Sequence, residues 1–453
     1  MTEEVTPGQI ATVPALVAGE WLRGGPHLDR VGPYLRRVVS RATAASPADV
    51  TRAVGYAPDA ARAVGRVSPA ARADVLDRAA RLATERRNQL AEQLAVELGK
   101  PVKDGRGEVD RVADTLAVCA AEARRIGGEL LPVAGWGRGV GNTALTYRAP
   151  AGVALAITPF NAPANLLAHK LGASFAAGNT TIVKAPPQAP ASSAALVSLL
   201  LDAGLPVEAV QLLHGGGDVG AQLCAADEVA VISFTGSAAT GAAVARAAGP
   251  KRLVLELGGN AATIVCEDAD VQAAARVCAR TGYSNSGQSC ISVQRVYVQR
   301  DRFTEFTEAL TAEVAKLRVG DPLDDATDVG SMVDVEAAER VVRWTAEAAA
   351  GGPGSCSAGP ATAPSCTRPW WQLPRPPRPS WCTRYSAPSW PYCPTTRSAR
   401  SSRRATPAGT ACRPACSPAT SAASSPPGGN WRWAGSWSTG RPTSGLTMFP
   451  SAA

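Results

Sequence analysis

The chain has 453 residues, enough for two or three domains with a large apolar core. Its net charge of +8 is unevenly distributed, because residues 351–453 hold 11 Arg and no Lys, Asp or Glu, which leaves residues 1–350 mildly acidic. The basic balance is therefore a property of the C-terminal stretch, and it gives no support to a nucleic-acid-binding function.

Cysteine usage and hydropathy indicate the compartment. Five cysteines precede residue 351 without a paired spacing, which is typical of a reduced cytoplasmic protein rather than a disulfide scaffold. The acidic N-terminus lacks the apolar segment of a secretory signal, and apolar runs such as 191–201 are too short to span a bilayer. We expect a cytoplasmic protein with no membrane or nucleic-acid partner and no metal site.

The first 150 residues predict mainly packing helices. Residues 1–35 are expected to be irregular, apart from a short strand at 15–18. Ser46-Pro47 and Ser68-Pro69 are typical of helix N-termini, with a capping hydroxyl followed by proline. Leucines at helical spacing predict that the second helix continues to Leu98 and stops at Gly99. The remaining elements expected here are a helix at 108–126 and a β-ribbon at 128–147.

After Pro150, short apolar runs rich in β-branched residues alternate with helical patterns. The expected strands are 152–157, 180–184, 210–213, 229–234 and 252–257, and the helices between them are 164–176, 192–203, 219–225 and 239–248. This alternation predicts an α/β fold with a parallel sheet covered on both faces. Ligands then bind at the carboxyl ends of the strands. A second α/β alternation starts after residue 261 and continues to 343.

Two polar residues stand at chemically suggestive places. Cys290 lies in the glycine-bearing loop of the stretch 281–298, just before an alternating strand pattern, and Glu256 ends an apolar strand before two glycines. A free cysteine is usually a small buried hydrophobe, and a lone glutamate is usually the partner of a nearby cation. Taken together, a thiol and a carboxylate are a candidate nucleophile and general base.

The order of four motifs resembles the aldehyde dehydrogenase superfamily over residues 15 to 350. These motifs are Thr158-Pro-Phe-Asn161, Phe234-Thr-Gly-Ser237, Glu256-Leu-Gly-Gly-Asn260 and Gly287-Gln-Ser-Cys290. The resemblance implies oxidation of a small-molecule aldehyde to a carboxylic acid with NAD or NADP. It implies that Cys290 forms a thiohemiacetal and then a thioester, that Asn161 donates to the oxyanion, and that Glu256 is the general base.

The same resemblance implies a set of cofactor-binding positions. Phe234, Gly236 and Ser237 would lie beside the dinucleotide, where a strand leads into a helix whose N-terminus favours a pyrophosphate. Lys184 would bind the adenosine ribose. Many NAD-preferring relatives carry a Glu three residues after this lysine, and Pro187 replaces it here, which admits NADP. The further positions are Thr158, Phe160, Gly216, Thr240 and Leu257.

The resemblance also implies a domain organisation. Residues 1–127 and 148–258 would form a Rossmann-like dinucleotide-binding domain with a parallel sheet, and residues 128–147 a β-ribbon arm that reaches a neighbouring subunit. Residues 259–350 would be the first part of an α/β catalytic domain. Members of this kind are homodimers or homotetramers.

Residues 351–453 do not fit this pattern. They hold 18 of the 36 Pro and 7 of the 10 Trp, with no Val or Ile, so they cannot build a core. We interpret them as a frameshifted and disordered tail, with the shift near 351–354. One shifted register re-reads 381–390 as Val-His-Glu-Val-Phe-Gly-Pro-Val-Val, which resembles a family motif whose glutamate holds the nicotinamide ribose. The same register re-reads 430–440 and 448–453 as Leu-Glu-Val-Gly-Gly-Val-Leu-Val-Asn-Gly and Val-Pro-Phe-Gly-Gly.

Two other functions are compatible with the residues. The chain could be an inactive remnant that still binds a dinucleotide, because the second glutamate is missing. It could also be a cysteine hydrolase or acyltransferase without a cofactor, although none of its three His lies near Cys290 in the sequence and Lys184 would then have no role.

Overall fold

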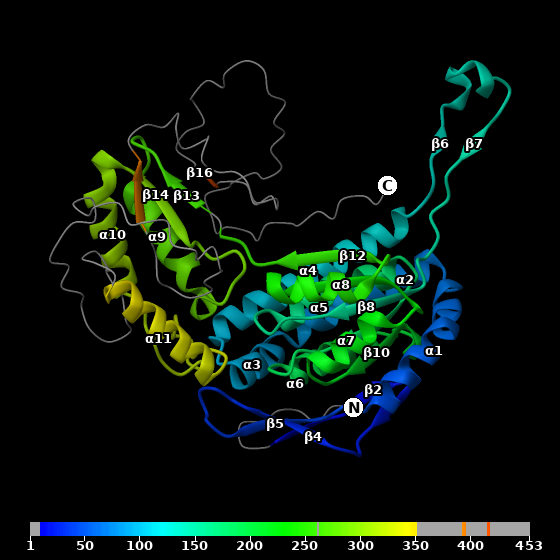
Figure 1. Ribbon diagram of the computed structural model, residues 1–453, viewed down its shortest axis with the longest axis horizontal. Coiled ribbons are helices and arrows are strands. Elements are labelled where there is room, and N and C mark those ends of the chain that lie inside the picture. Colours follow the sequence, from blue (N-terminus) through cyan, green and yellow to red (C-terminus); the bar gives the residue numbers. More distant parts are fainter. Residues whose placement is uncertain (1–9, 261, 351–391, 396–414, 417–453) are drawn as a thin grey trace. The chain divides into compact units, whose positions relative to one another are not determined.

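The computed structural model describes residues 10–260, 262–350, 392–395 and 415–416 (Figure 1). Two compact units divide the chain. The first comprises Met1–Gly258, Ser284–Cys290 and Leu317–Arg343, and the second comprises Gly259–Tyr283, Ile291–Lys316 and Trp344–Ala453.

A seven-stranded sheet is the centre of the first unit, with the strand order β12-β11-β8-β9-β10-β2-β3. Its strands are β2 (Ala15–Val17), β3 (Glu20–Leu22), β8 (Val153–Ile157), β9 (Thr180–Lys184), β10 (Val210–Leu213), β11 (Val229–Gly236) and β12 (Arg252–Leu257). The strands from β8 to β12 are parallel, and β2 and β3 continue the sheet in antiparallel fashion. The predicted parallel sheet is confirmed.

Helices cover both faces of this sheet. One apolar cluster contains α2 (Pro69–Glu85), α3 (Arg87–Leu98), α4 (Val102–Arg125), α5 (Pro163–Ala176) and α6 (Pro190–Asp202). A second cluster contains α1 (Pro47–Gly65), α7 (Gly217–Ala225) and α8 (Ala238–Ala248). Side chains of the parallel strands alternate between the two clusters, so β8 gives Leu155 to the α1 side and Ala156 to the α4 side. Strands β8, β9 and β10 are therefore buried on both faces, as their apolar sequences require, whereas the edge strand β12 is partly exposed.

Two predictions for the N-terminal region are wrong. The long helix expected up to Leu98 is two helices, because Arg86 (φ −93°, ψ 17°) leaves helical geometry between α2 and α3. This break lets Ala83 before it and Leu90 after it enter the same apolar cluster. The region expected to be irregular contains the strands β1 (Ala11–Val13) and β4 (His27–Val31), which flank β5 (Val38–Thr43). Strand β4 could not be recognised from its sequence, because its residues are mostly exposed and do not form an apolar run.

Helix starts follow the predicted caps. The Ser46 hydroxyl accepts a hydrogen bond from the Asp49 N–H, and the Asp49 carboxylate accepts one from the Ser46 N–H, which completes a capping box. The Ser68 hydroxyl caps α2 by accepting a hydrogen bond from the Ala71 N–H. Helix α4 starts six residues earlier than expected and includes Gly105, where a Cβ would lie 3.0 Å from the Ala91 carbonyl oxygen. Glycine at this position therefore allows α4 to pack closely against α3.

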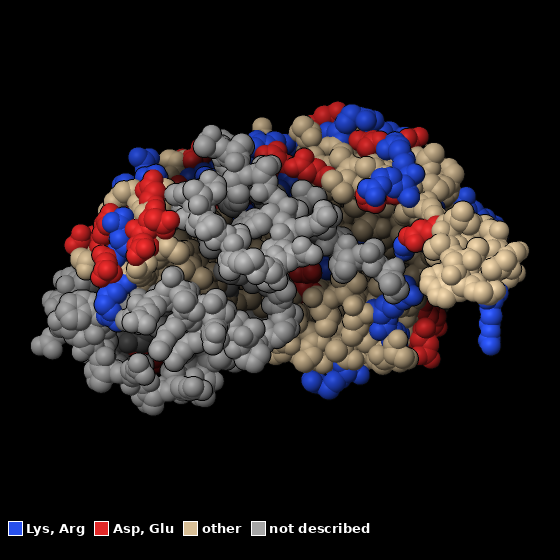
Figure 2. All heavy atoms as spheres, turned by 90° about the horizontal axis from the view of Figure 1, so that it is seen from above, with Lys and Arg blue, Asp and Glu red and all other residues tan. Residues whose placement is uncertain are grey.

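The stretch 128–147 forms the predicted β-ribbon, with β6 (Leu130–Leu131) antiparallel to β7 (Ala144–Leu145). It projects from the helices of the first unit (Figure 1). Several of its apolar side chains are exposed, among them Trp136, Val140 and Tyr147. Figure 2 shows Lys and Arg interspersed with Asp and Glu over the described residues of the face it presents. Among the described residues, no helix combines the length and the apolar character that a bilayer span needs.

The second unit has a four-stranded sheet with the order β15-β14-β13-β16. Its elements are β13 (Ala262–Val265), α9 (Val271–Tyr283), β14 (Arg295–Gln299), α10 (Phe303–Ala315), β15 (Tyr392–Thr395) and β16 (Ala415–Cys416). Helix α11 spans Val335–Ala350. The interpretation of residues 351–453 as a frameshifted tail, including the three re-read motifs, lies outside the described residues except at β15 and β16.

Candidate active site

Predicted cofactor-binding and catalytic residues lie at the carboxyl ends of the parallel strands. Lys184, Ile157 and Phe234 are in register across neighbouring strands. One residue further along β11, Thr235 pairs with Glu256 of β12. Ligands of parallel sheets bind at this edge, so the register places the candidate base at the expected edge.

Glu256 is exposed and lies on the face of the sheet that α5 covers. Its neighbour Leu255 belongs to the α8 side, and side chains alternate along a strand. Lys170 of α5 is buried, and its ammonium donates to the Ser233 hydroxyl at 2.9 Å. Burial lowers the pKa of Lys170 to about 8, while attraction to the Glu256 carboxylate acts in the opposite direction. The ammonium is therefore still charged at neutral pH and sits within electrostatic reach of the candidate base.

The lowered pKa of Lys170 predicts a pH-dependent contribution to stability. The folded pKa is about 8 and the ordinary value is 10.5, so the unfolded chain binds more protons between these pH values. The contribution of Lys170 to the free energy of unfolding is therefore constant below pH 8 and rises between pH 8 and pH 10.5. Relative to Lys170→Met, the wild type should gain roughly 3 kcal/mol across this window in urea titrations.

Other buried groups do not disturb this comparison. Burial raises the pKa of Cys278 and Tyr283 to about 12, which lowers stability at alkaline pH, but both groups are present in both proteins and their effects cancel in the difference. A difference that stays flat from pH 8 to 10.5 would contradict the assignment of a perturbed Lys170.

Asn161 lies in the loop that joins β8 to α5. At the start of this loop, the Thr158 N–H donates to the Lys184 carbonyl oxygen at 3.3 Å, and the half-buried Phe160 packs against the α4-side apolar cluster. The Asn161 carbonyl oxygen accepts from the Lys100 ammonium at 2.8 Å. The backbone of the candidate oxyanion donor is thus fixed by contacts on both sides.

Cys290 follows the short turn Ser284–Gly287 and is exposed, whereas Cys119, Cys224 and Cys278 are buried. The Asn285 side-chain amide donates to the Asn161 carbonyl oxygen at 3.1 Å. The structure thus joins the loop of the candidate nucleophile to the loop of the candidate oxyanion donor, although 124 residues separate the two asparagines.

The strand-to-helix turn after β11 has the features expected at a phosphate site. Ser237 caps α8, and its hydroxyl accepts a hydrogen bond from the Thr240 N–H at 3.1 Å. The other N–H groups in the first turn of α8 have no acceptor within the helix, so the N-terminus of α8 favours an anion. A Cβ on Gly241 would lie 2.6 Å from a methyl carbon of Leu257, so this glycine allows α8 to pack on β12. Leu257 is therefore part of the packing under the turn.

The ends of β9 and β10 supply the other predicted cofactor positions. Burial lowers the pKa of Lys184 to about 8, and the Asp218 carboxylate acts in the opposite direction. Gly216 caps α7 beside Asp218, and Pro187 is exposed in the loop after Lys184. A carboxylate therefore does lie near Lys184, but Asp218 supplies it and not a glutamate at position 187.

Two buried polar atoms at this edge of the sheet fit the presence of a polar ligand. Thr235 Oγ1 and His214 Nδ1 have no hydrogen-bond partner within the described part of the chain. Burial lowers the pKa of His214 to about 4, so its ring is neutral at pH 7. Buried polar atoms normally find partners, and a dinucleotide at the carboxyl ends of the strands would bring polar groups to this region.

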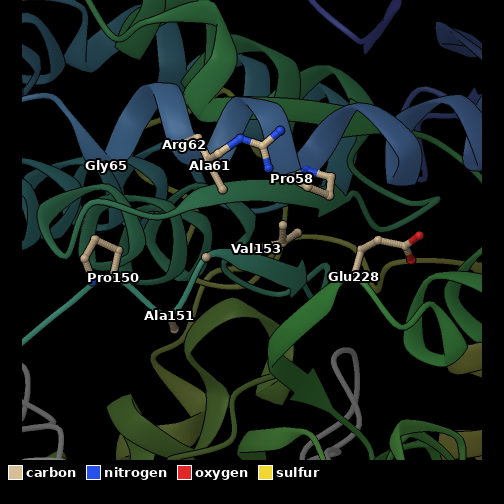
Figure 3. A pocket seen from close by; sticks show the side chains of 9 residues that line it. Pro58, Ala61, Arg62, Gly65, Pro150, Ala151, Val153 and Glu228 are labelled. Carbon is tan, nitrogen blue, oxygen red and sulfur yellow. The ribbon is translucent and has the colours of Figure 1, made fainter.

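A shallow pocket of about 380 Å³ lies at the opposite edge of the sheet (Figure 3). Pro58 and Arg62 of α1 line it together with Val153 at the start of β8 and Glu228 just before β11. It does not include any of the predicted site residues.

The sequence did not point to the residues that hold the two loops, namely Lys100, Asp104, Glu108 and Asn285. It also did not point to the buried Lys170 near Glu256. A signal existed for Lys170, because a lysine within the largely apolar helix 163–176 is rarely buried without a partner. The others are ordinary charged or polar residues in the sequence, and the hydrogen bonds by which they hold the two loops span 50 residues or more.

The chain matches the sequence profile of the Aldehyde dehydrogenase family over residues 21–366. It belongs to this family of enzymes. It is 40% identical over 333 residues to a 3-sulfolactaldehyde dehydrogenase of Priestia aryabhattai, which covers 73% of this chain and 69% of the relative. It is 32% identical to a lactaldehyde dehydrogenase of Methanococcus aeolicus, over 72% of this chain and 70% of that one.

Solved structures show the same fold. The NADP-dependent glyceraldehyde-3-phosphate dehydrogenase of Bacillus halodurans, complexed with NADP, superimposes with a TM-score of 0.74 at 32% identity, covering 78% of this chain and 75% of that chain. Aldehyde dehydrogenase 21 of Physcomitrella patens, in complex with succinate, gives a TM-score of 0.74 at 30% identity, with coverage of 79% and 75%. The fold class expected from the sequence is confirmed.

Proposed function

We propose that this protein oxidises a small aldehyde to a carboxylic acid with NAD or NADP and water, through Cys290, Asn161 and Glu256. One observation carries the assignment: the loop of the exposed Cys290 is hydrogen-bonded to the backbone of Asn161. A nucleophile and an oxyanion donor have to lie together in this way for acyl chemistry.

In the proposed reaction the Cys290 thiolate adds to the aldehyde carbon, and the carbonyl π electrons move to oxygen as an oxyanion. The Asn161 side-chain amide and the Cys290 N–H would donate to that oxyanion. A bound nicotinamide would accept the hydride that leaves the same carbon, which converts the thiohemiacetal to a thioester. Glu256 would take a proton from the water that attacks the thioester, and the thiolate leaves as the acid forms.

Residues at the other strand ends would hold the dinucleotide. Lys184 would bind the adenosine ribose, and the turn Gly236–Thr240 would meet the pyrophosphate at the N-terminus of α8. Asp218 lies close enough to Lys184 to act on its charge, so the loss of a carboxylate at Pro187 does not by itself select NADP. We further propose the domain limits given above and a role for the ribbon 128–147 in oligomerisation.

The relatives suggest a class of substrate. They are named for 3-sulfolactaldehyde, lactaldehyde and glutarate semialdehyde, which are short aldehydes with hydroxyl or anionic groups. We infer that this protein acts on an aldehyde of that class. A panel of these aldehydes with each cofactor, followed by absorbance of the reduced nicotinamide, tests the inference against a long apolar aldehyde as the control.

The role of Glu256 predicts that its loss affects one half of the reaction. p-Nitrophenyl acetate acylates a thiolate through the same kind of oxyanion and needs no nicotinamide. Glu256→Gln should keep the initial burst of p-nitrophenolate but slow the later turnover by about 10²- to 10⁴-fold, because the base is used to activate water. Glu228→Gln is a matched control away from the site. A burst lost in Glu256→Gln would instead assign Glu256 to activation of the thiol.

A further inference from the structure

We propose that Asn285 is a positioning residue that locks the nucleophile loop to the oxyanion-donor loop, and that α4 is the support to which both loops are fixed. The inference rests on the proposed roles of Cys290 and Asn161. It concerns how these two residues are held at a fixed distance from each other.

The first turn of α4 holds the nucleophile loop. The Asp104 carboxylate accepts a hydrogen bond from the Asn285 N–H at 3.0 Å and one from the Ser284 hydroxyl at 3.2 Å. Asp104 lies in the N-terminal turn, where the helix dipole favours a negative charge. The start of the loop is thus tied to a rigid helix.

The same helix holds the oxyanion-donor loop. Lys100, just before α4, donates to the Asn161 carbonyl oxygen and forms a buried ion pair with Glu108. The other oxygen of Glu108 accepts from the N–H groups of Ala164 and Asn165, at 2.9 and 3.1 Å, in the first turn of α5. The ion pair therefore fixes both Asn161 in the loop and the helix that follows the loop.

The Asn285 side chain connects the nucleophile loop to the oxyanion-donor loop. Its side-chain amide and the Lys100 ammonium both donate to the Asn161 carbonyl oxygen, at 3.1 and 2.8 Å. A carbonyl oxygen has two lone pairs, so these two donors fix the plane of the peptide group that follows Asn161. Any displacement of the nucleophile loop would then move the backbone of the oxyanion donor as well.

The backbone of the nucleophile loop explains why asparagine occupies this position. Asn285 (φ 51°, ψ 39°) and Ser286 (φ 57°, ψ 33°) are both left-handed, and Gly287 follows with φ 74°. Asparagine tolerates this region better than other residues that have a Cβ. Such strain persists only where contacts hold it. Here the Ser286 hydroxyl donates to the Gly330 carbonyl oxygen at 3.0 Å, and the Gln288 side chain accepts from the Val333 N–H at 2.9 Å.

The test compares two reactions of the same thiol. Asn285→Gly removes the side-chain amide but keeps the backbone N–H that bonds Asp104, and glycine accepts the left-handed backbone without strain. Acylation by p-nitrophenyl acetate needs the thiolate and the Asn161 amide aligned, whereas alkylation by iodoacetamide forms no oxyanion. We expect the acylation burst to slow by about 10- to 100-fold, in line with the cost of misplacing a reacting group. Alkylation of the Cys290 peptide, followed by mass spectrometry, should change less than about threefold, because it does not depend on that alignment.

Asn142→Gly is the matched control, because Asn142 is exposed on the ribbon and its side-chain amide donates to the Arg138 carbonyl oxygen. It should leave both rates unchanged. A double variant completes the design: in an Asn161→Ala background, Asn285→Gly should slow acylation by less than about twofold further, since both changes act on one interaction.

Three results would overturn the proposal. Asn285→Gly could acylate at the wild-type rate, it could lose acylation and alkylation in equal proportion, or its effect could multiply with that of Asn161→Ala. Failure of the proposed function looks different, because the wild type itself would then show no burst that depends on Cys290.

Discussion

Replacing Cys290 by serine is expected to abolish both the p-nitrophenolate burst and aldehyde oxidation, with a loss of at least about 10³-fold in each rate. A serine hydroxyl is hardly ionised at neutral pH, whereas a few per cent of an ordinary thiol is already thiolate. Because the change removes one sulfur atom from an exposed loop residue, the fold should be unaffected.

The burst and the reduced nicotinamide measure this loss in the two assays. Cys266→Ser is the control, since Cys266 is half-buried in the second unit and has no proposed role. Equal activity of Cys290→Ser and the wild type would remove the basis of the proposed mechanism, whatever the family of the chain.

The second change with a large expected effect is restoration of the reading frame that we propose is shifted near 351–354. The re-read sequence of 381–390 contains Glu-Val-Phe-Gly-Pro, whose glutamate would hold the nicotinamide ribose. The 453-residue chain has no acidic residue after 350. The repaired chain should therefore oxidise its aldehyde roughly 10²-fold faster or more, because a loosely held nicotinamide misplaces the reacting carbon.

Two measurements test this prediction. Sequencing the DNA for residues 340–370 should reveal a missing or extra base, and kcat of the two chains should then be compared with the same aldehyde. The repaired chain with glutamine in place of the restored glutamate is the control and should lose most of the gain. The prediction is wrong if the DNA encodes the 453-residue chain without a shift and that chain already turns over as fast as the repaired one.

The parallel sheet could be predicted almost residue by residue. Strands β9, β10 and β12 begin and end where expected. For β9 and β10 the reason is that a strand buried on both faces favours an apolar sequence. Strand β4 could not be predicted, because its side chains are mostly exposed and its pairing with β5 decides its structure. The break between α2 and α3 at Arg86 could not be predicted either, because it depends on tertiary packing and no pattern in the neighbouring residues indicates it.

The candidate site divides in the same way. Local motifs that resemble those of the aldehyde dehydrogenase family are sufficient to nominate Cys290, Glu256 and Asn161. The contacts that hold them link residues far apart in sequence, as between Asn285 and Asn161, and no local pattern encodes such a pair. The structure also places Lys170 near Glu256, which required the register of β11 and β12 and the position of α5.

The division of the first unit into three chain segments has a consequence for folding on the ribosome. Residues 1–258 form the sheet and its helices, but the nucleophile loop is synthesised only after residues 259–283 of the second unit, and the stretch 317–343 that supports it only after residues 291–316. Closing such long loops is slow. The left-handed turn at Asn285 therefore forms late, and the dinucleotide edge of the sheet should exist before the thiol is brought to it.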